Sequence, residues 1–243
     1  MTRRIYVLLL VSALLAGSAG RPDAARLESD ERTALHVLNR VTFGPRPGDV
    51  TRVQQMGVER FIDEQLHPER IPDGGIAGRL DGFETLHLSS REIAQRYEIP
   101  AIQARRARQK QAGDKPVDPP PSPQQMPMDP ERQRANLPLL ELSQQRVVRA
   151  VYSDRQLEEV LTDFWFNHFN VDSRKGPARY MLTEYERDAI RPHVLGRFRD
   201  LLGATATSPA MLFYLDNWMS ADPNGPHVDR SRPGAGALGA RLR

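Results

Sequence analysis

The chain has 243 residues, of which 39% are hydrophobic and 27% are charged, and it contains no cysteine. A chain of this length can bury a core either as one large domain or as two small ones. The lack of cysteine excludes disulfides, thiolate metal ligands, a cysteine nucleophile and a lipid-modified cysteine anchor.

The formal net charge of +3 lies at the ends of the chain rather than in its body. Two of the 34 Lys and Arg residues precede residue 21 and four follow Ala221, which leaves 28 between them. Two of the 31 acidic residues follow Ala221, which leaves 29, so the body is close to neutral. Aromatic residues for base stacking are not interleaved with the remaining basic cluster, Arg105, Arg106, Arg108 and Lys110. We therefore expect no nucleic-acid partner.

Residues 1–20 have the layout of a secretory signal peptide. Arg3 and Arg4 precede an apolar run over residues 5–16, and small residues follow at 17–20. A membrane-spanning helix needs about 20 apolar residues, and this run is shorter. We expect export to the periplasm or the cell exterior, with no stable membrane anchor after cleavage.

Helix start and stop signals predict four short helices in the N-terminal part, residues 21–99. Ser29 or Asp30 caps the first, Gly57 ends the second, and the fourth stops before Pro100. The first helix is expected between the cap at 29–30 and the break at 43–45. The other three are expected over residues 47–56, 58–66 and 89–99.

Residues 100–130 change to a composition of Gln, Arg, Lys and Pro. Seven prolines after residue 115 predict a linker or surface insertion without regular structure. No repeat and no useful strand alternation occurs along the chain. The sequence therefore predicts an all-α fold, an irregular multi-helix domain with a Pro-rich linker.

Most aromatic residues lie in the second helical part, residues 131–221. A helix ends at Tyr152, and Ser153 with Gln156 has the spacing of a capping box for the next helix. Helical spacing on that helix groups an apolar stripe with His168 near its centre, formed by Leu157, Val160, Leu161, Phe164 and Trp165. We expect this stripe to belong to the core, with His168 buried.

Two further helices are predicted from proline and serine signals. Pro192 opens the first, which places His193 in its first turn, and Phe198 and Leu202 lie on its apolar face. Ser208 caps the second, which runs to about Asn217.

No metalloprotease helix, nucleophile elbow, phosphate loop or dinucleotide fingerprint occurs in the chain. His168 is the first candidate for a divalent-metal ligand, because neutral imidazole is the commonest metal ligand. Asn167 and Asn170 are candidates for orienting its ring. The alternative is a core histidine that is hydrogen-bonded to a carbonyl or an asparagine.

Glu184 and His193 are the other candidate metal ligands. Glu184 and Asp188 are four residues apart, a spacing that a carboxylate metal site or an acid/base pair uses. Arg187 and Arg191 lie among them, so a salt-bridged surface is the alternative. A further candidate, Asn217, either orients a bound group or caps the end of the last helix.

Four sequence blocks resemble those of the bacterial domain of unknown function 1800 family. The blocks are V-T-F-G-P-R-P-G-D-V, F-W-F-N-H-F, R-P-H-x-x-G-x-F and A-M-L-x-Y-L-D-N, at residues 41–50, 164–169, 191–198 and 210–217. The resemblance covers about residues 30–221 and implies an exported, largely helical protein without an assigned activity. It also implies a later region that this chain lacks, so the chain resembles a C-terminally truncated member with a disordered, out-of-frame tail at 222–243.

Two functions stay open on the sequence alone. The first is an exported, metal-dependent enzyme in which His168, His193 and Glu184 bind a divalent metal at a site that a missing C-terminal half completes. The second is a non-catalytic binding or assembly protein with a cell-envelope protein as partner, in which the same residues only specify the core.

Overall fold

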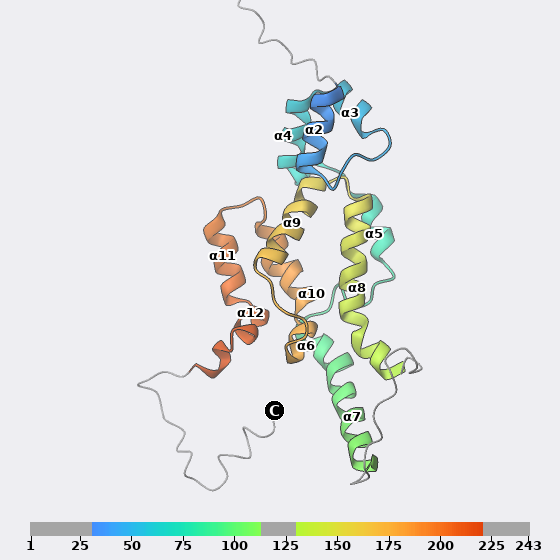
Figure 1. The fold of residues 1–243 in the computed structure, drawn as a ribbon, viewed down its shortest axis with the longest axis vertical. Coiled ribbons are helices and arrows are strands. Elements are labelled where there is room, and N and C mark those ends of the chain that lie inside the picture. Colours follow the sequence, from blue (N-terminus) through green and yellow to red (C-terminus); the bar gives the residue numbers. More distant parts are fainter. Residues whose placement is uncertain (1–30, 113–129, 221–243) are drawn as a thin grey trace, which may run out of the picture. The chain divides into compact units, whose positions relative to one another are not determined.

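The computed structural model describes residues 31–112 and 130–220, and these residues form helices, turns and loops without a β-strand (Figure 1). The predicted all-α fold is confirmed. None of the helices in these two ranges is both long and apolar enough to cross a membrane. The predicted signal peptide and the predicted tail at 222–243 lie outside the described residues.

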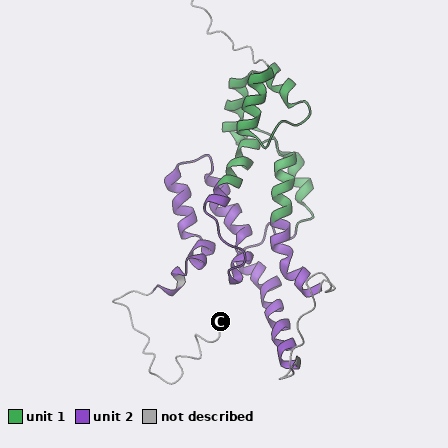
Figure 2. Cartoon of the chain, in the orientation of Figure 1, with its two compact units in different colours: residues 1–83, 143–164 green, residues 84–142, 165–243 purple. Residues whose placement is uncertain are grey.

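The chain divides into two compact units, each built from two separate stretches (Figure 2). Unit 1 comprises residues 1–83 and 143–164, and unit 2 comprises residues 84–142 and 165–243. The divisions fall inside the long helix α8 (Pro130–Tyr152) and inside α9 (Gln156–His168). Each unit is described by itself below.

The N-terminal helices of unit 1 form a small bundle, as the sequence predicts. Helices α2 (Glu31–Val41), α3 (Asp49–Met56) and α4 (Val58–Leu66) pack together around the buried side chains of Ala34, Leu38, Val53 and Phe61. Gly57 ends α3 and begins α4 with a φ of 90°, which glycine adopts without the clash that a Cβ would cause. The predicted cap at Ser29 or Asp30 lies outside the described residues.

The sequence did not predict the next two elements of unit 1, a 3₁₀ turn (Pro68–Arg70) and α5 (Gly74–Leu80). Three glycines in α5 hide its helical pattern, although Ile76 and Leu80 are buried on one face. The guanidinium of Arg79 lies 3.8 Å from the ring centre of Tyr152, at the end of α8. This contact joins the two stretches of unit 1.

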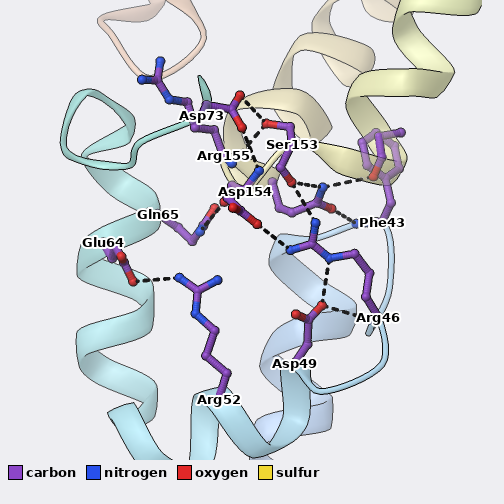
Figure 3. A network of polar contacts seen from close by, with 12 residues as sticks. Phe43, Arg46, Asp49, Arg52, Glu64, Gln65, Asp73, Ser153, Asp154 and Arg155 are labelled. Carbon is purple, nitrogen blue, oxygen red and sulfur yellow. Dashed lines mark hydrogen bonds and ion pairs between the residues drawn. The ribbon is translucent and has the colours of Figure 1, made fainter. Parts of the chain in front are cut away.

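A network of polar contacts makes the main junction between the two stretches of unit 1 (Figure 3). The Arg46 guanidinium donates to the carbonyl of Ser153 at 3.1 Å and to the carboxylate of Asp154 at 3.0 Å. It also pairs with Asp49 at 3.2 Å, and these contacts raise the Arg46 pKa although partial burial opposes the rise. Arg46 therefore connects α3 to the turn between α8 and α9.

The same turn is held from two more places (Figure 3). The Asp73 carboxylate accepts hydrogen bonds from the Ser153 hydroxyl at 2.9 Å and from the Asp154 N–H at 3.0 Å. The buried amide of Gln65 donates to the Asp154 carbonyl at 2.9 Å and accepts from the Leu157 N–H at 3.1 Å. The turn therefore satisfies its backbone groups with side chains that are about 80 to 90 residues away in the sequence.

The capping box predicted for α9 is not the arrangement observed. The Ser153 hydroxyl donates to Asp73, and the Gln156 amide donates to the carbonyls of Ala150 and Ser153 at 3.0 and 2.8 Å. The Gln156 oxygen accepts from the Phe43 N–H at 3.2 Å. Both residues lie at the start of α9 as expected, and the Ser153 hydroxyl accepts locally from the Arg155 N–H at 3.1 Å. They bind distant groups as well, and the reciprocal pair of a capping box is not formed.

The first helical run of unit 2 corrects the predicted linker. It comprises α6 (Ser90–Ile93), a π-helix (Ala94–Glu98) and α7 (Ile99–Ala112), and it begins with the capping box of Ser89 and Glu92. The predicted stop before Pro100 is wrong, and so is the irregular structure predicted for 100–112, where Ala, Arg, Gln and Lys favour helix. Residues 113–129 lie outside the described residues.

The second helical run of unit 2 lies between a 3₁₀ turn (Gly176–Tyr180) and α11 (Phe198–Thr207). It comprises α10 (Leu182–Glu184), a π-helix (Tyr185–Ile190) and a 3₁₀ turn (Arg191–His193). Pro192 therefore lies at the end of a helical run, and the prediction that it opens a helix is wrong. The chain turns at Gly196, and α11 starts only at Phe198.

Both π-helices end two residues before a proline, Pro100 in the first run and Pro192 in the second. Proline has no N–H for the helical hydrogen bond, and its ring clashes with the carbonyl four residues earlier. The wider π turn gives that carbonyl a different partner, so the run continues past the proline. This accounts for the helix that the sequence did not predict beyond Pro100.

The core of unit 2 combines an apolar cluster with a buried carboxylate. Ile93, Tyr97 and Tyr180 form the cluster, and burial raises the pKa of both tyrosines. The buried Glu141 on α8 accepts hydrogen bonds from the Thr85 N–H and the Thr85 hydroxyl, both at 2.7 Å. Helix α12 (Pro209–Tyr214), whose predicted Ser208 cap is confirmed at 3.2 Å to the Met211 N–H, and a 3₁₀ turn (Asn217–Met219) complete the unit.

We predict that Gln65→Met lowers the free energy of unfolding by about 2 kcal/mol, because it leaves the Asp154 carbonyl and the Leu157 N–H without their partner. Urea unfolding followed by circular dichroism measures the change. The exposed Gln55 on α3 supplies the matched control, and Gln55→Met should change stability by less than about 0.5 kcal/mol. Equal effects of the two substitutions would show that the network does not stabilise unit 1.

Candidate functional site

Two cavities lie on unit 2, and residues of the corner at which α11 and α12 meet line both of them. The first, called here the carboxylate cavity, has a volume of about 280 Å³ and contains Glu184 and Asp188 in its wall. The second, called here the apolar cavity, has a volume of about 340 Å³. Its wall consists of Phe169, Leu202, Thr205, Ala206, Met211, Leu212, Leu215 and Asn217.

Protein groups already bind both acids of the carboxylate cavity. The Glu184 carboxylate accepts a short hydrogen bond from the Ser90 N–H. The Asp188 carboxylate receives two hydrogen bonds from Arg187, at 2.8 and 2.7 Å. The same guanidinium donates to the carbonyls of Leu86 and Leu88 at 2.8 and 3.0 Å. Glu184 and Asp188 do share one side of the helical run as predicted. Glu184 binds residue 90 directly, and Asp188 binds the arginine that holds residues 86 and 88.

Glu186, on the buried side of the same helical run, is also bound by a protein group. It is 1% exposed, and its carboxylate pairs with the Arg191 guanidinium at 3.1 Å. The geometry of this segment therefore matches the salt-bridged alternative that Arg187 and Arg191 indicated in the sequence.

The apolar cavity borders a cluster of stacked aromatic rings. The rings of Trp165 and Phe169 are parallel to within 15° and 5.6 Å apart, and Phe198 lies 5.7 Å from Trp165 and 6.4 Å from Phe169. Phe198 is nevertheless 55% exposed, and Leu202 and Leu215 beside the cavity are 44% and 66% exposed. We call these five residues, Trp165, Phe169, Phe198, Leu202 and Leu215, the aromatic surface.

The sequence predicted that the end of α9 is buried on both sides, and the structure confirms only one of them. Phe166, on the side opposite the stripe, is buried as expected, whereas Phe164 is 53% exposed and His168 is exposed, so the predicted burial of His168 is wrong. The buried positions earlier in the helix are polar, namely Gln156, Glu159 and Thr162. Each of them has a hydrogen-bond partner: Gln156 the carbonyls before α9, Glu159 the Arg149 guanidinium at 3.4 Å, and Thr162 the Glu158 carbonyl at 2.7 Å. These polar groups are satisfied inside unit 1, and the apolar stripe is not fully buried: Phe164 is exposed, and its other members are partly buried.

His168 contributes to the aromatic surface rather than to a buried site. Its ring meets Trp165 edge-on at 5.4 Å and Phe169 edge-on at 5.0 Å. Asn167 and Asn170, the predicted orienting residues, are both exposed.

His193 ends a 3₁₀ turn, so the prediction that it lies in the first turn of a helix is wrong. Its Nδ1 atom is buried and has no hydrogen-bond partner within the part of the chain that the structure describes. Asn217 lines the apolar cavity, where its side-chain oxygen accepts from the Ser220 hydroxyl at 3.1 Å. In residues 31–112 and 130–220, no three His, Asp or Glu side chains lie close enough together to hold a metal ion. The assignment of His168, His193 and Glu184 as metal ligands stays a prediction.

The exposure of Phe198, Leu202 and Leu215 was not predicted, because their helical spacing is that of ordinary core residues. One signal for Phe198 was present. Arg197 and Arg199 flank it, and the long charged side chains of two such neighbours are rarely buried.

Comparison with known proteins gives one match. The family model described as "Protein of unknown function (DUF1800)" matches residues 36–225, which is well over half of the chain. No curated protein and no solved structure matches the chain.

Tyr185 connects the walls of the two cavities. Its side chain lines the carboxylate cavity, and its hydroxyl donates to the carbonyl of Phe169 at 2.8 Å. Burial raises the pKa of Tyr185 well above its usual value. The phenol therefore stays neutral in the folded state at a pH at which an unfolded tyrosine, with a pKa of about 10, loses its proton.

We predict that Tyr185→Phe has opposite effects on stability at neutral and alkaline pH. At pH 7 the loss of the hydrogen bond to Phe169 lowers the free energy of unfolding by about 1 kcal/mol. Because the folded-state pKa of Tyr185 is raised, deprotonation above about pH 10 favours the unfolded state and lowers the free energy of unfolding of the wild type. Phenylalanine has no such proton, so the free energy of unfolding of the variant should fall less steeply with pH there. Urea unfolding at a series of pH values measures both effects; identical slopes in the two proteins would contradict the prediction.

Proposed function

The chain belongs to the DUF1800 family of proteins of unknown function, and we propose that it is an exported, non-catalytic binding protein of the cell envelope. The aromatic surface of unit 2 is its proposed contact with a second protein. The metal-dependent alternative uses other residues, His168, His193 and Glu184, so the two functions lead to different experiments.

The exposure of Phe198, Leu202 and Leu215 is the observation that carries this proposal. Single exposed apolar residues are normal on a soluble protein, but a contiguous group around a concave site is typical of a binding surface. A ligand that covers these side chains removes apolar area from water, which favours association. The apolar wall of the adjacent cavity extends the area that a ligand can cover.

The aromatic surface also has the rigidity that favours binding. Trp165 and Phe169 stack on each other, and Phe198 packs against both rings. Aromatic side chains have only two rotatable bonds, and mutual contact restricts them further. A partner therefore loses little affinity to the ordering of side chains on this side of the interface.

Export is supported by the sequence of the first 20 residues, with its basic pair Arg3 and Arg4, its apolar run and its small residues at 17–20. A binding protein in the envelope needs no metal site or reaction centre. It needs a stable scaffold and an accessible surface, and unit 2 supplies the surface.

The metal-dependent alternative requires His168 to be a ligand. It predicts that a complete, exported protein carries a divalent metal in fixed stoichiometry and that His168→Ala lowers that stoichiometry while the helical melt is unchanged. Elemental analysis of the purified protein, before and after dialysis against chelator, measures this. We expect equal metal contents in the wild type and the variant, and a stoichiometric loss in the variant would overturn the proposed function.

We predict that a photo-crosslinking amino acid at position 202 gives a discrete adduct with one other protein in the periplasmic fraction of cells that export the full chain. The same amino acid at the exposed position of Gln55 should give none. Phe198→Ser should reduce the adduct from position 202 by about tenfold, because it removes the exposed ring next to the cavity.

Phe43→Ser is the matched control for that substitution. Phe43 is 49% exposed and lies in unit 1. Its substitution therefore removes a phenyl ring of similar exposure from outside the aromatic surface. Its adduct yield should equal that of the wild type. Adducts of no defined mass, or an equal loss with both variants, would count against the aromatic surface as the binding site.

A further inference from the structure

We infer that the partner presents an apolar anchor side chain flanked by carboxylates, with the anchor in the apolar cavity and the carboxylates at Arg197 and Arg199. This inference rests on the proposed function and specifies the chemistry of the ligand. It is carried by the volume and lining of the cavity and by the charges that flank Phe198 in the aromatic surface.

The apolar cavity has the volume and the walls for one large side chain. At about 340 Å³ it lies at the lower end of the range for ligand pockets, so it suits an anchor residue rather than a large cofactor. Met211, Leu212 and Leu215 line it from one helix and the turn that follows, and Leu202 and Phe169 line it from two other elements. Leu, Met or Phe as the anchor would contact apolar atoms on several sides.

Arg197 and Arg199 give the surface its charge. Both flank Phe198 at the start of α11, and both are exposed. Neither forms an ion pair with another residue in the ranges 31–112 and 130–220. Asp200 follows them, so residues 197–200 carry a net charge of +1. Guanidinium groups beside an exposed aromatic ring match a ligand with carboxylates next to an apolar group.

Asn217 adds a polar group at the wall of the same cavity. Its side-chain oxygen is occupied by the Ser220 hydroxyl, which leaves its amide N–H groups to donate. A peptide carbonyl next to the anchor residue would accept such a bond. The cavity therefore combines an apolar lining with a hydrogen-bond donor, the Asn217 amide. Such a combination fixes the position and direction of a bound chain segment.

A protein segment suits these features better than an anionic membrane does. A bilayer surface has no projecting side chain that enters a cavity. Protein helices that bind a bilayer surface carry a continuous apolar face. On α11, Leu201 is buried, and the large apolar side chains that are exposed on that helix are those of Phe198 and Leu202. We therefore assign the charge of Arg197 and Arg199 to the recognition of protein carboxylates.

A display library of random short peptides, selected on the full chain, tests the inference. The enriched peptides should carry Leu, Met or Phe next to Asp or Glu. Peptides selected on the variant Arg197→Glu/Arg199→Glu should still be enriched in the apolar residue but no longer in the acidic one. Fluorescence anisotropy with the strongest peptide should show an affinity about tenfold lower for that variant, and weaker binding by the wild type as the salt concentration rises.

The double variant Arg105→Glu/Arg106→Glu is the control for net charge. Both residues are exposed on α7, so the total charge changes equally without a change beside Phe198. This control should bind the peptide as the wild type does. An equal loss of peptide affinity in both double variants would show that the effect comes from the overall charge of the protein, and it would overturn the inference.

The outcomes separate the inference from the function on which it rests. Apolar enrichment without acidic residues overturns the inference and leaves the proposed binding function intact. No enrichment of apolar residues by the wild type, or equal enrichment by Phe198→Ser, overturns both. Sedimentation with phosphatidylglycerol vesicles that depends on Arg197 and Arg199 would assign the arginines to a membrane instead.

Discussion

The turn between α8 and α9 is the constraint on which unit 1 depends. Its residues come after more than 140 others in the chain, yet its polar groups bind Arg46, Gln65 and Asp73 from the first stretch of the unit. A buried backbone group without a partner costs roughly 1–3 kcal/mol, so each of these side chains is needed where it is. The apolar bundle of α2, α3 and α4 has no comparable means of selecting one orientation of the turn, because apolar contacts are not directional.

The same requirement for polar satisfaction explains the partly exposed apolar stripe of α9. Gln156, Glu159 and Thr162 are buried because their partners are built into unit 1, and a helix that turns this side inward presents Phe164 to solvent. The arrangement exposes apolar area that a helix ordinarily buries. Large exposed apolar patches mark contact surfaces, which is the physical basis for the binding surface that we propose.

Local signals in the sequence predicted local structure well. Gly57 between α3 and α4, the helix start at residues 89–90, and Ser208 before α12 all act within a few residues of their own position, and the structure confirms them. Non-local effects could not be read from spacing alone. The partner of Gln65 is 89 residues away and that of Asp73 is 80, so neither the buried polar face of α9 nor the exposure of Phe198 could be derived from periodicity.

The two prolines show a second limit of local rules, and they also bear on the candidate site. A proline at position 100 or 192 predicts a helix boundary, but a π turn before each one lets the helical run continue to it or past it. In the second run the π turn contains Tyr185 and Asp188, and the chain then reverses through Gly196 into Phe198. The chain that leaves the π turn therefore leads, through the 3₁₀ turn and Gly196, to the start of α11, where Phe198 packs against Trp165. The exposed ring and the two arginines beside it are placed by a backbone feature whose only sequence signal is Pro192.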